Sequence, residues 1–210
     1  PRINMIAILG DRYGWRPLPV EIPATEFEII FQRITSGIGR SLLSHWYRLD
    51  ENSIPPVYIL QPRKGKFKDY QLWKKKVEQP LRAYLTEAVL DLDFPLEIQL
   101  KYITSATEQE IFKGVFSQPD PVESAIFCIR SIRNLPRTLH AEEFIDMDIH
   151  GEIDFEAQSR LQNLKDRLFD RISSKNLYSY DAVWKSDGIS TDHINHFCQA
   201  SIVIDKISPP

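Results

Sequence analysis

Hydrophobic residues gather in short continuous runs at some places along the chain and in spaced stripes at others. Four continuous runs stand out, at 3–9, 57–60, 125–130 and 177–180. Apolar runs of roughly four to eight residues are typical of strands buried on both faces of a parallel sheet. The pattern therefore predicts four strands.

Between these runs, apolar residues recur at the spacing of amphipathic helices. The expected helices cover 24–34, 40–48, 67–90, 106–116, 154–174 and 191–204. In the clearest one, Leu161, Leu164, Leu168 and Ile172 repeat at three- and four-residue intervals, which places them on one face. Strands that alternate with helices predict a three-layer α/β fold, with a mostly parallel, doubly wound sheet and helices on both of its faces.

Ligands of such folds bind beyond the carboxyl ends of the strands, near the point where the strand order reverses. This rule predicts a site among 10–15, 61–64, 130–134 and 180–184. The sequence has no G-x-x-x-x-G-K-[ST] motif, so we expect no P-loop nucleotide site within it. The serine-nucleophile motif G-x-S-x-G is absent as well.

Composition narrows the class of protein. With 210 residues, 42% of them hydrophobic, the chain is long enough for a single α/β domain over 1–210. No apolar run approaches the roughly 18 residues that span a bilayer, and residues 3–9 lack the basic lead of a signal peptide. Cys128 and Cys198 are too few for a disulfide scaffold. We therefore expect a cytoplasmic protein with no membrane partner.

Charge is unevenly distributed, although the net charge of −3 argues against bulk nucleic-acid binding. A basic stretch carries Arg63, Lys64, Lys66, Lys68, Lys74, Lys75 and Lys76. Phe67, Tyr70 and Trp73 interleave these bases, so the stretch is a candidate for single-stranded nucleic acid through phosphate pairing and base stacking. The same aromatic spacing also fits the buried stripe of a helix whose lysines face water, and we favour that interpretation.

Two clusters have spacings close to those of metal sites. The acids at 146–154 resemble an oxygen-ligand calcium loop, but they lack the bidentate glutamate that closes such a loop. His193 and His196 share a helix face, whereas Cys198 points away from it and no second ligand pair follows. We therefore predict no metal site in this chain.

The pattern A-T-E-x-E-I occurs twice, first at Ala24 and again in the second half of the chain. Each copy fits a capping box, in which the threonine caps a helix and the second glutamate, Glu28 or Glu110, reaches back to it. The first glutamates, Glu26 and Glu108, then lie in the first turn, where the helix dipole favours negative charge. Helix initiation explains both copies without any catalytic role.

One segment is more specific than these patterns. Residues 9–19 read Leu-Gly-Asp-Arg-Tyr-Gly-Trp-Arg-Pro-Leu-Pro, and Ile-Pro-Ala-Thr-Glu-Phe-Glu follows at 22–28. Together with 46–58, 106–111 and 114–127, this segment resembles an uncharacterised domain that precedes NACHT-type STAND NTPase modules, often with WD or other repeats after them. Relatives of that domain occur in nephrocystin-like, telomerase-associated and bacterial multidomain NTPases.

The resemblance covers most of the chain but not the family's opening strand and helix, which this sequence lacks. It therefore implies that 3–9 is the second strand of the sheet, and that the first strand of the fold is missing ahead of Pro1. The non-methionine start at the edge of a strand agrees with this expectation.

The family is similar to TIR domains and flavodoxin-like folds in its order of strands, loops and helices. Some TIR domains use a helix glutamate beside a nucleotide pocket to cleave NAD, and the resemblance assigns that role to Glu26 or Glu28. The loop that would bind the ligand contains Asp11, Arg12, Tyr13 and Trp15. Here the aromatic rings would form a platform and the arginine would meet the diphosphate. Alternatively, the rings lock the loop by packing, and the arginine pairs with a helix carboxylate.

The resemblance implies an effector or signal-coupling domain at the N-terminus of a STAND NTPase, active in bacterial antiviral defence through oligomerisation. The implied partners are a second copy of the chain and the NTPase and sensor parts of the parent protein, with 154–174 and 191–204 as candidate contact surfaces. The alternatives are an NAD-cleaving hydrolase, for which NAD is the substrate, and a nucleic-acid-binding module that uses the basic stretch.

Overall fold

The computed structural model describes residues 5–118, 125–148, 150–186 and 188–190. The chain divides into two compact units. Unit 1 comprises Pro1–Trp15 and Ser105–Pro210, and unit 2 comprises Arg16–Thr104. In the sequence, unit 2 is therefore an insertion between the two parts of unit 1.

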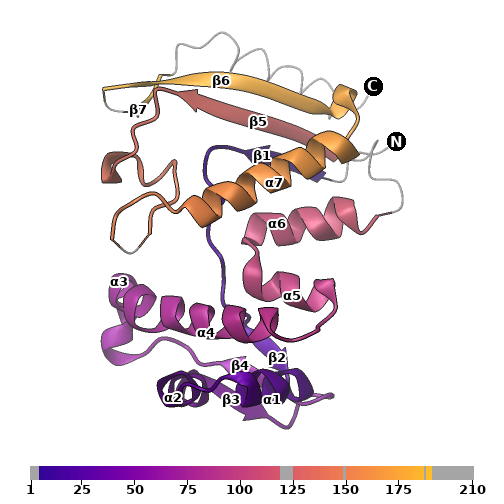
Figure 1. Cartoon of the computed structure of the whole chain (residues 1–210), viewed down its shortest axis with the longest axis vertical. Coiled ribbons are helices and arrows are strands. Elements are labelled where there is room, and N and C mark those ends of the chain that lie inside the picture. Colours follow the sequence, from indigo (N-terminus) through magenta and orange to yellow (C-terminus); the bar gives the residue numbers. More distant parts are fainter. Residues whose placement is uncertain (1–4, 119–124, 149, 187, 191–210) are drawn as a thin grey trace. The chain divides into compact units, whose positions relative to one another are not determined.

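Unit 1 is built on a mostly parallel sheet (Figure 1). Its strands are β1 (Met5–Leu9), β5 (Ala125–Arg133), β6 (Leu177–Lys185) and β7 (Gly188–Ile189), in the order β1-β5-β6-β7. β5 pairs in parallel with β1 on one side and with β6 on the other, whereas the short β7 is antiparallel to β6. Residues 125–129 of β5 are all buried, as a continuous apolar run predicts for a central strand.

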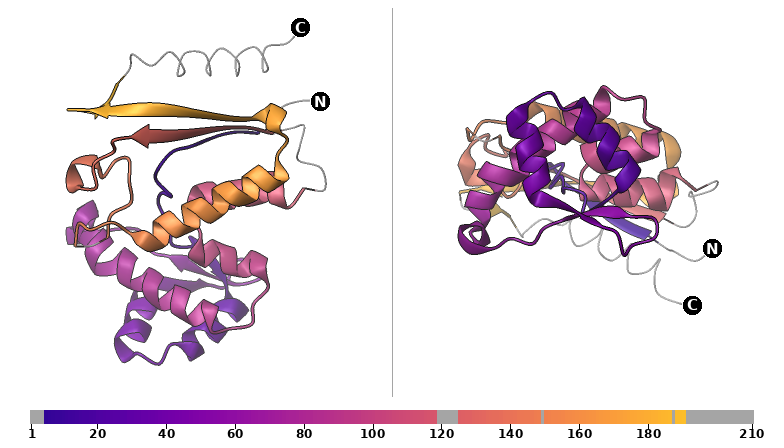
Figure 2. Two further views of the ribbon diagram at one scale, coloured as in Figure 1. Left: turned by 45° about the horizontal axis from the view of Figure 1, so that its top comes forward. Right: turned by 90° about the horizontal axis from the view of Figure 1, so that it is seen from below.

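Helices cover one face of this sheet (Figures 1 and 2). They are α6 (Ala106–Ile111), its π-helical continuation Phe112–Phe116, and α7 (Phe155–Arg171). α7 connects the parallel strands β5 and β6, and it buries the leucines that its spacing predicts. Leu164 and Leu168 of this helix pack in one hydrophobic cluster with Phe127 and Ile129 of β5.

Unit 2 combines a small antiparallel sheet with helices of its own. Its strands are β2 (Glu21–Pro23), β3 (Tyr47–Asp50) and β4 (Val57–Leu60), in the order β2-β4-β3. Its helices are α1 (Ala24–Arg33), α2 (Gly37–Trp46), α3 (Tyr70–Trp73), α4 (Gln79–Leu90) and α5 (Leu96–Ile103), with a 3-10 turn at Gly65–Lys68 and a π-helical turn at Lys74–Glu78. One hydrophobic cluster, which includes Ile22, Phe27, Leu43, Leu81 and Tyr102, joins the sheet to the helices.

The expected α/β class with a mostly parallel sheet is confirmed. One predicted strand has a different place, because β4 forms at 57–60 but pairs antiparallel in unit 2 rather than in the parallel sheet. The turn before it explains the difference. The Asp50 carboxylate accepts hydrogen bonds from the Asn52 amide at 3.0 Å and from the Ser53 hydroxyl at 3.2 Å. These bonds stabilise a turn, after which the chain returns alongside β3.

Part of the sequence-based prediction falls on residues outside those that the structure describes. The helix expected at 191–204 lies outside them, together with His193, His196 and Cys198. Among the helices that are described, none is both long and apolar enough to cross a membrane.

Candidate functional site

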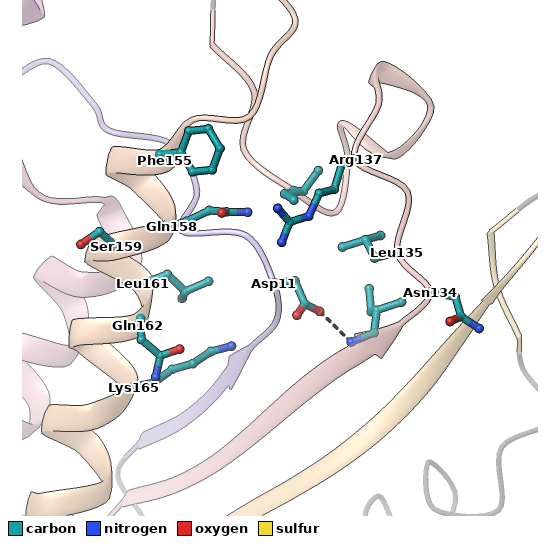
Figure 3. Close-up of a pocket in the computed structure, with 12 residues that line it drawn as sticks. Asp11, Asn134, Leu135, Arg137, Phe155, Gln158, Ser159, Leu161, Gln162 and Lys165 are labelled. Carbon is teal, nitrogen blue, oxygen red and sulfur yellow. Dashed lines mark hydrogen bonds between the residues drawn. The ribbon is translucent and has the colours of Figure 1, made fainter.

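A cavity of about 650 Å³ lies in unit 1 beyond the carboxyl ends of β1 and β5 (Figure 3). It is lined by the loop after β1, the end of β5 and the loop that follows it, and residues 155–165 of α7. Its polar side chains are Asp11, Asn134, Arg137, Gln158, Ser159, Gln162 and Lys165. The volume falls within the range of roughly 300–1,000 Å³ that is typical of small-molecule sites. The cavity lies where parallel α/β sheets bind their ligands.

Asp11 ties the two strand ends together at the base of this cavity. Its Oδ2 accepts a hydrogen bond from the Ile132 amide of β5 at 3.0 Å, which Figure 3 marks. Burial raises the pKa of the Asp11 carboxyl, while Lys165, the Ile132 amide and Arg130 act in the opposite direction. Because the first turn after β1 is bonded to β5, the carboxylate has a fixed position.

Lys165 is the most unusual member of the cavity. It follows Leu161 and Leu164 on the buried side of α7, and the residue is only 9% exposed. Burial lowers the pKa of its ammonium group, and the charge of Asp11 opposes that shift. Among the described residues, nothing forms a hydrogen bond or a close ion pair with it. In Figure 3 the side chain extends from the helix toward the side of the cavity where Asp11 lies.

A second cavity of about 380 Å³ adjoins the same helix. It shares Gln162 and Lys165 with the first cavity, and Ser131, Tyr180 and Asp181 line its other side. The Lys165 side chain therefore lines both cavities. Of the positions predicted from strand ends, those after β1 and β5 meet at the first cavity, and Tyr180 and Asp181 of β6 reach the second. Positions 61–64 belong to unit 2.

The loop that follows Asp11 is held by Asp146, a buried carboxylate. Asp146 accepts hydrogen bonds from the Tyr13 amide at 2.5 Å and the Gly14 amide at 3.2 Å, and Arg12 Nε lies 3.4 Å from its Oδ1. Arg12 does pair with a carboxylate, but the alternative placed that carboxylate on a helix, and this part is wrong because Asp146 lies in a loop. Trp15 is 55% exposed and is therefore accessible as a contact surface.

Tyr13 is packed rather than displayed, with only 2% of its surface exposed. Its hydroxyl donates to Glu108 Oε2 at 2.6 Å and accepts from the Ser105 amide at 3.1 Å. Arg167 of α7 completes the group with a 2.9 Å ion pair to Glu108. Burial and the Glu108 carboxylate both raise the pKa of the Tyr13 hydroxyl. The interpretation that Tyr13 locks the loop by packing is confirmed.

Glu26 has the same kind of environment in unit 2. It is buried in the first turn of α1, accepts a hydrogen bond from the Tyr102 hydroxyl, and pairs with Lys101 Nζ at 2.7 Å. Burial and the neighbouring carboxylate raise the pKa of Tyr102. Glu28 is exposed on the same helix. The assignment of NAD cleavage to Glu26 or Glu28 stays a prediction, and neither residue lines the cavity of unit 1.

The capping assignments in both copies of the repeated pattern are wrong. α6 begins at Ala106, and its cap is Ser105, whose hydroxyl accepts from the Glu108 amide at 3.2 Å. α1 begins at Ala24, directly after Pro23, and no side chain caps it. In each helix the threonine lies inside the first turn, and the first glutamate takes the third position. The capping-box pattern therefore predicts the N-cap position of each helix two residues too late in the chain.

The basic stretch is anchored by its aromatic residues. Trp73 is buried against Trp46, with ring centroids 4.5 Å apart, and Phe67 packs edge-on against Trp46 at 5.3 Å. The buried-stripe interpretation is confirmed for Trp73 of α3, whereas Phe67 is partly buried and lies on the preceding 3-10 turn. Tyr70 is exposed, and the Arg63 guanidinium lies 5.5 Å from its ring centroid. Other bases of the stretch, including Lys64, Lys75 and Lys76, face solvent, whereas Lys74 is partly buried.

The chain is similar in sequence to parts of large multidomain proteins. It is 29% identical over 224 residues to NACHT and WD repeat domain-containing protein 2 of Mus musculus. Its homologues are NACHT- and WD repeat-containing proteins. The human protein of the same name is 28% identical over 223 residues, and the mouse NACHT domain- and WD repeat-containing protein 1 is 28% identical over 195 residues.

These similarities cover 91–92% of this chain but only 12–13% of each relative, so the chain spans about an eighth of the length of the curated proteins that it matches. No family model matches the chain, and no solved structure matches it significantly. The similarity supports the expectation that this region is associated with a NACHT domain.

Proposed function

We propose that this chain is an effector or signal-coupling module of a NACHT-type STAND NTPase, in which the two units act together as one module. The observation that carries the proposal is the similarity to NACHT- and WD repeat-containing proteins over nearly the whole chain. In this proposal, the region responds by contact to the state of the NTPase and repeat parts of its parent protein. We place this module in the cytoplasm, in a defence system against phage.

Self-association is the proposed mode of action, and α7 offers a surface for it. Phe169 is 48% exposed on this helix although it is a large apolar residue. Exposed aromatic residues are frequent anchors of protein interfaces. Oligomerisation of the NTPase would bring several such surfaces together, and the gain in effective concentration would then drive contact between the modules.

The test compares a fusion of the chain to a tetramerising tag with the untagged chain. We expect the tetrameric fusion to capture free chain in a pull-down, and Phe169→Glu to reduce that capture. Leu96→Glu is the matched control, because it introduces the same charge at an apolar residue of α5 that is 57% exposed in unit 2. Failure of the fusion to capture free chain at any concentration would contradict the proposal.

The enzymatic alternative requires a different result. Nicotinamide release from NAD by the tetrameric fusion, abolished by Glu28→Gln, would favour NAD cleavage. Glu28 is the informative position because its carboxylate is exposed, whereas Glu26 is bonded to Tyr102 and Lys101. The nucleic-acid alternative predicts salt-sensitive binding of single strands that is weakened by the double change Lys74→Glu and Lys75→Glu.

A further inference from the structure

The cavity of about 650 Å³ in unit 1 contains a cation that makes no hydrogen bond or ion pair among the described residues. Lys165 lies on the apolar side of α7, yet no carboxylate there approaches within ion-pair distance. Burying an ammonium group is costly unless an anion or several hydrogen bonds compensate it. Asp11 shares the cavity and acts on Lys165 only through its charge at a distance. The ammonium group therefore has unused capacity for an anion.

A second cation enters the same space from the opposite wall. Arg137 lies in the loop after β5, is exposed, and has no hydrogen bond or ion pair among the described residues. Figure 3 shows Arg137 and Gln158 reaching from two sides toward the space above Asp11. The charged side chains that line the cavity are thus Lys165 and Arg137 against Asp11, and the balance is positive.

The remaining lining indicates a ligand larger than a simple anion. The Asp11 carboxylate and the amides of Gln158 and Gln162 offer hydrogen-bond partners for hydroxyl groups. A volume of about 650 Å³ leaves room for an organic body beside the anionic group. Two cations that line one cavity, with hydroxyl acceptors beside them, fit a sugar phosphate, because lysine and arginine form charge-assisted hydrogen bonds with phosphate.

We propose that this cavity binds a phosphorylated sugar, with Lys165 and Arg137 on the phosphate and Asp11 on a sugar hydroxyl. The site lies entirely within unit 1. The proposal is separate from self-association, because Phe169, the residue proposed for that contact, does not line this cavity. A ligand here would contact the ends of β1 and β5 and the first half of α7 at once, and would stabilise their arrangement.

The test is a calorimetric titration of the 210-residue chain with ribose 5-phosphate at low ionic strength. We expect saturable binding that weakens about ten-fold or more in Lys165→Met and in Arg137→Gln, since each change removes a charge-assisted hydrogen bond. Ribose without phosphate should not bind detectably. Inorganic phosphate should bind more weakly than ribose 5-phosphate, and Asp11→Asn should tighten inorganic phosphate by removing a nearby negative charge.

The matched control is Lys175→Gln. Lys175 is an exposed lysine just before β6, it lies outside the cavity lining, and its replacement removes the same charge. Unchanged affinity in both Lys165→Met and Arg137→Gln, or an equal loss in Lys175→Gln, would overturn the proposal. Absence of binding by the unmodified chain would overturn it as well. Arg137 is exposed, so Arg137→Gln keeps the test valid if Lys165→Met does not fold.

Discussion

Two of the three buried glutamates among the described residues, Glu108 in unit 1 and Glu26 in unit 2, have similar surroundings. Glu108 and Glu26 each occupy the third position of a helix, and each accepts a hydrogen bond from a buried tyrosine hydroxyl. Each also pairs with a cation, Arg167 for Glu108 and Lys101 for Glu26. Burying a carboxylate costs free energy unless hydrogen bonds and a counter-charge compensate it, as they do for both of these glutamates. The first glutamate of each copy of the repeated pattern therefore stabilises the interior of its unit.

The Tyr13 hydroxyl should be worth measurable stability. Tyr13→Phe removes a donor to Glu108 and an acceptor for the Ser105 amide, and leaves both groups buried without that partner. We expect a loss of about 1–3 kcal/mol in the free energy of unfolding, measured by urea denaturation. Tyr178→Phe is the control, since its hydroxyl bonds to the Lys175 carbonyl in an exposed position. A smaller loss in Tyr13→Phe than in the control would contradict this assignment.

Glu26 and Glu28 lie on the same helix, α1, but Glu26 is buried and Glu28 is exposed. Glu26→Gln weakens the bond to Tyr102 and leaves Lys101 without its counter-charge, whereas Glu28 is exposed. We expect Glu26→Gln to destabilise the protein by about 3 kcal/mol and Glu28→Gln by no more than about 0.5 kcal/mol. Thermal unfolding followed by circular dichroism measures both. Equal melting temperatures for the two variants would show that the Glu26 contacts are not stabilising.

Buried tyrosines also determine how the protein responds to alkali. The pKa values of Tyr13, Tyr47 and Tyr102 lie above the ordinary value of 10.0, mainly because burial disfavours the phenolate. Above pH 10 the unfolded chain releases these protons while the folded chain retains them. Stability is therefore fully present below pH 10 and falls as the pH rises above it.

The free energy of unfolding, measured between pH 8 and about pH 11, should decline more steeply in the unmodified chain than in Tyr47→Phe. That variant keeps the aromatic ring and loses the titrating hydroxyl, which donates to the Pro19 carbonyl at 2.8 Å. Identical slopes in the two proteins would show that Tyr47 titrates normally in the folded state.

At the scale of elements, mutations at the N-terminal cap of α6 can test where this helix begins. The Ser105 hydroxyl accepts from the Glu108 amide, while Thr107 lies inside the first turn. We expect Ser105→Ala to cost about 1 kcal/mol in the free energy of unfolding and Thr107→Ala to cost less than half of that. Guanidinium denaturation of the two variants decides the matter. A larger loss in Thr107→Ala than in Ser105→Ala would contradict this assignment and would indicate that Thr107 caps the helix, as the sequence pattern predicts.

The periodic elements could be predicted from sequence, and the others could not. α7 shows a clear pattern because it buries one stripe of residues, and β5 shows one because it buries both faces. Both elements contribute to the same hydrophobic cluster. β2 and β3 are too short to show a period, and β4 could not be assigned to its sheet because pairing depends on a turn at Asp50. Strand ends located the cavity at Asp11, but Lys165 was missed. A lysine within an apolar helical stripe was the available signal.

At the scale of the whole molecule, unit 2 has the features of an inserted domain. Each unit has its own hydrophobic clusters, and the large cluster of unit 2 contains only residues between 16 and 104. In unit 1, the Ala106 amide donates to the Trp15 carbonyl at 3.1 Å. The chain therefore leaves unit 1 and re-enters it at neighbouring points, which is the geometry that tolerates an insertion.

This geometry predicts that residues 16–104 fold without the rest of the chain. The fragment retains the antiparallel sheet, the helices packed on it and the contacts of Glu26 with Lys101 and Tyr102, so the buried Glu26 carboxylate keeps its described partners. We expect cooperative thermal unfolding of the isolated fragment and dispersed amide resonances in its proton–nitrogen spectrum. Glu26→Gln should lower the melting temperature of the fragment and of the full chain in the same direction. A fragment with collapsed resonances and no unfolding transition would show instead that residues 1–210 fold as one cooperative domain, because unit 2 would then depend on unit 1 for its stability.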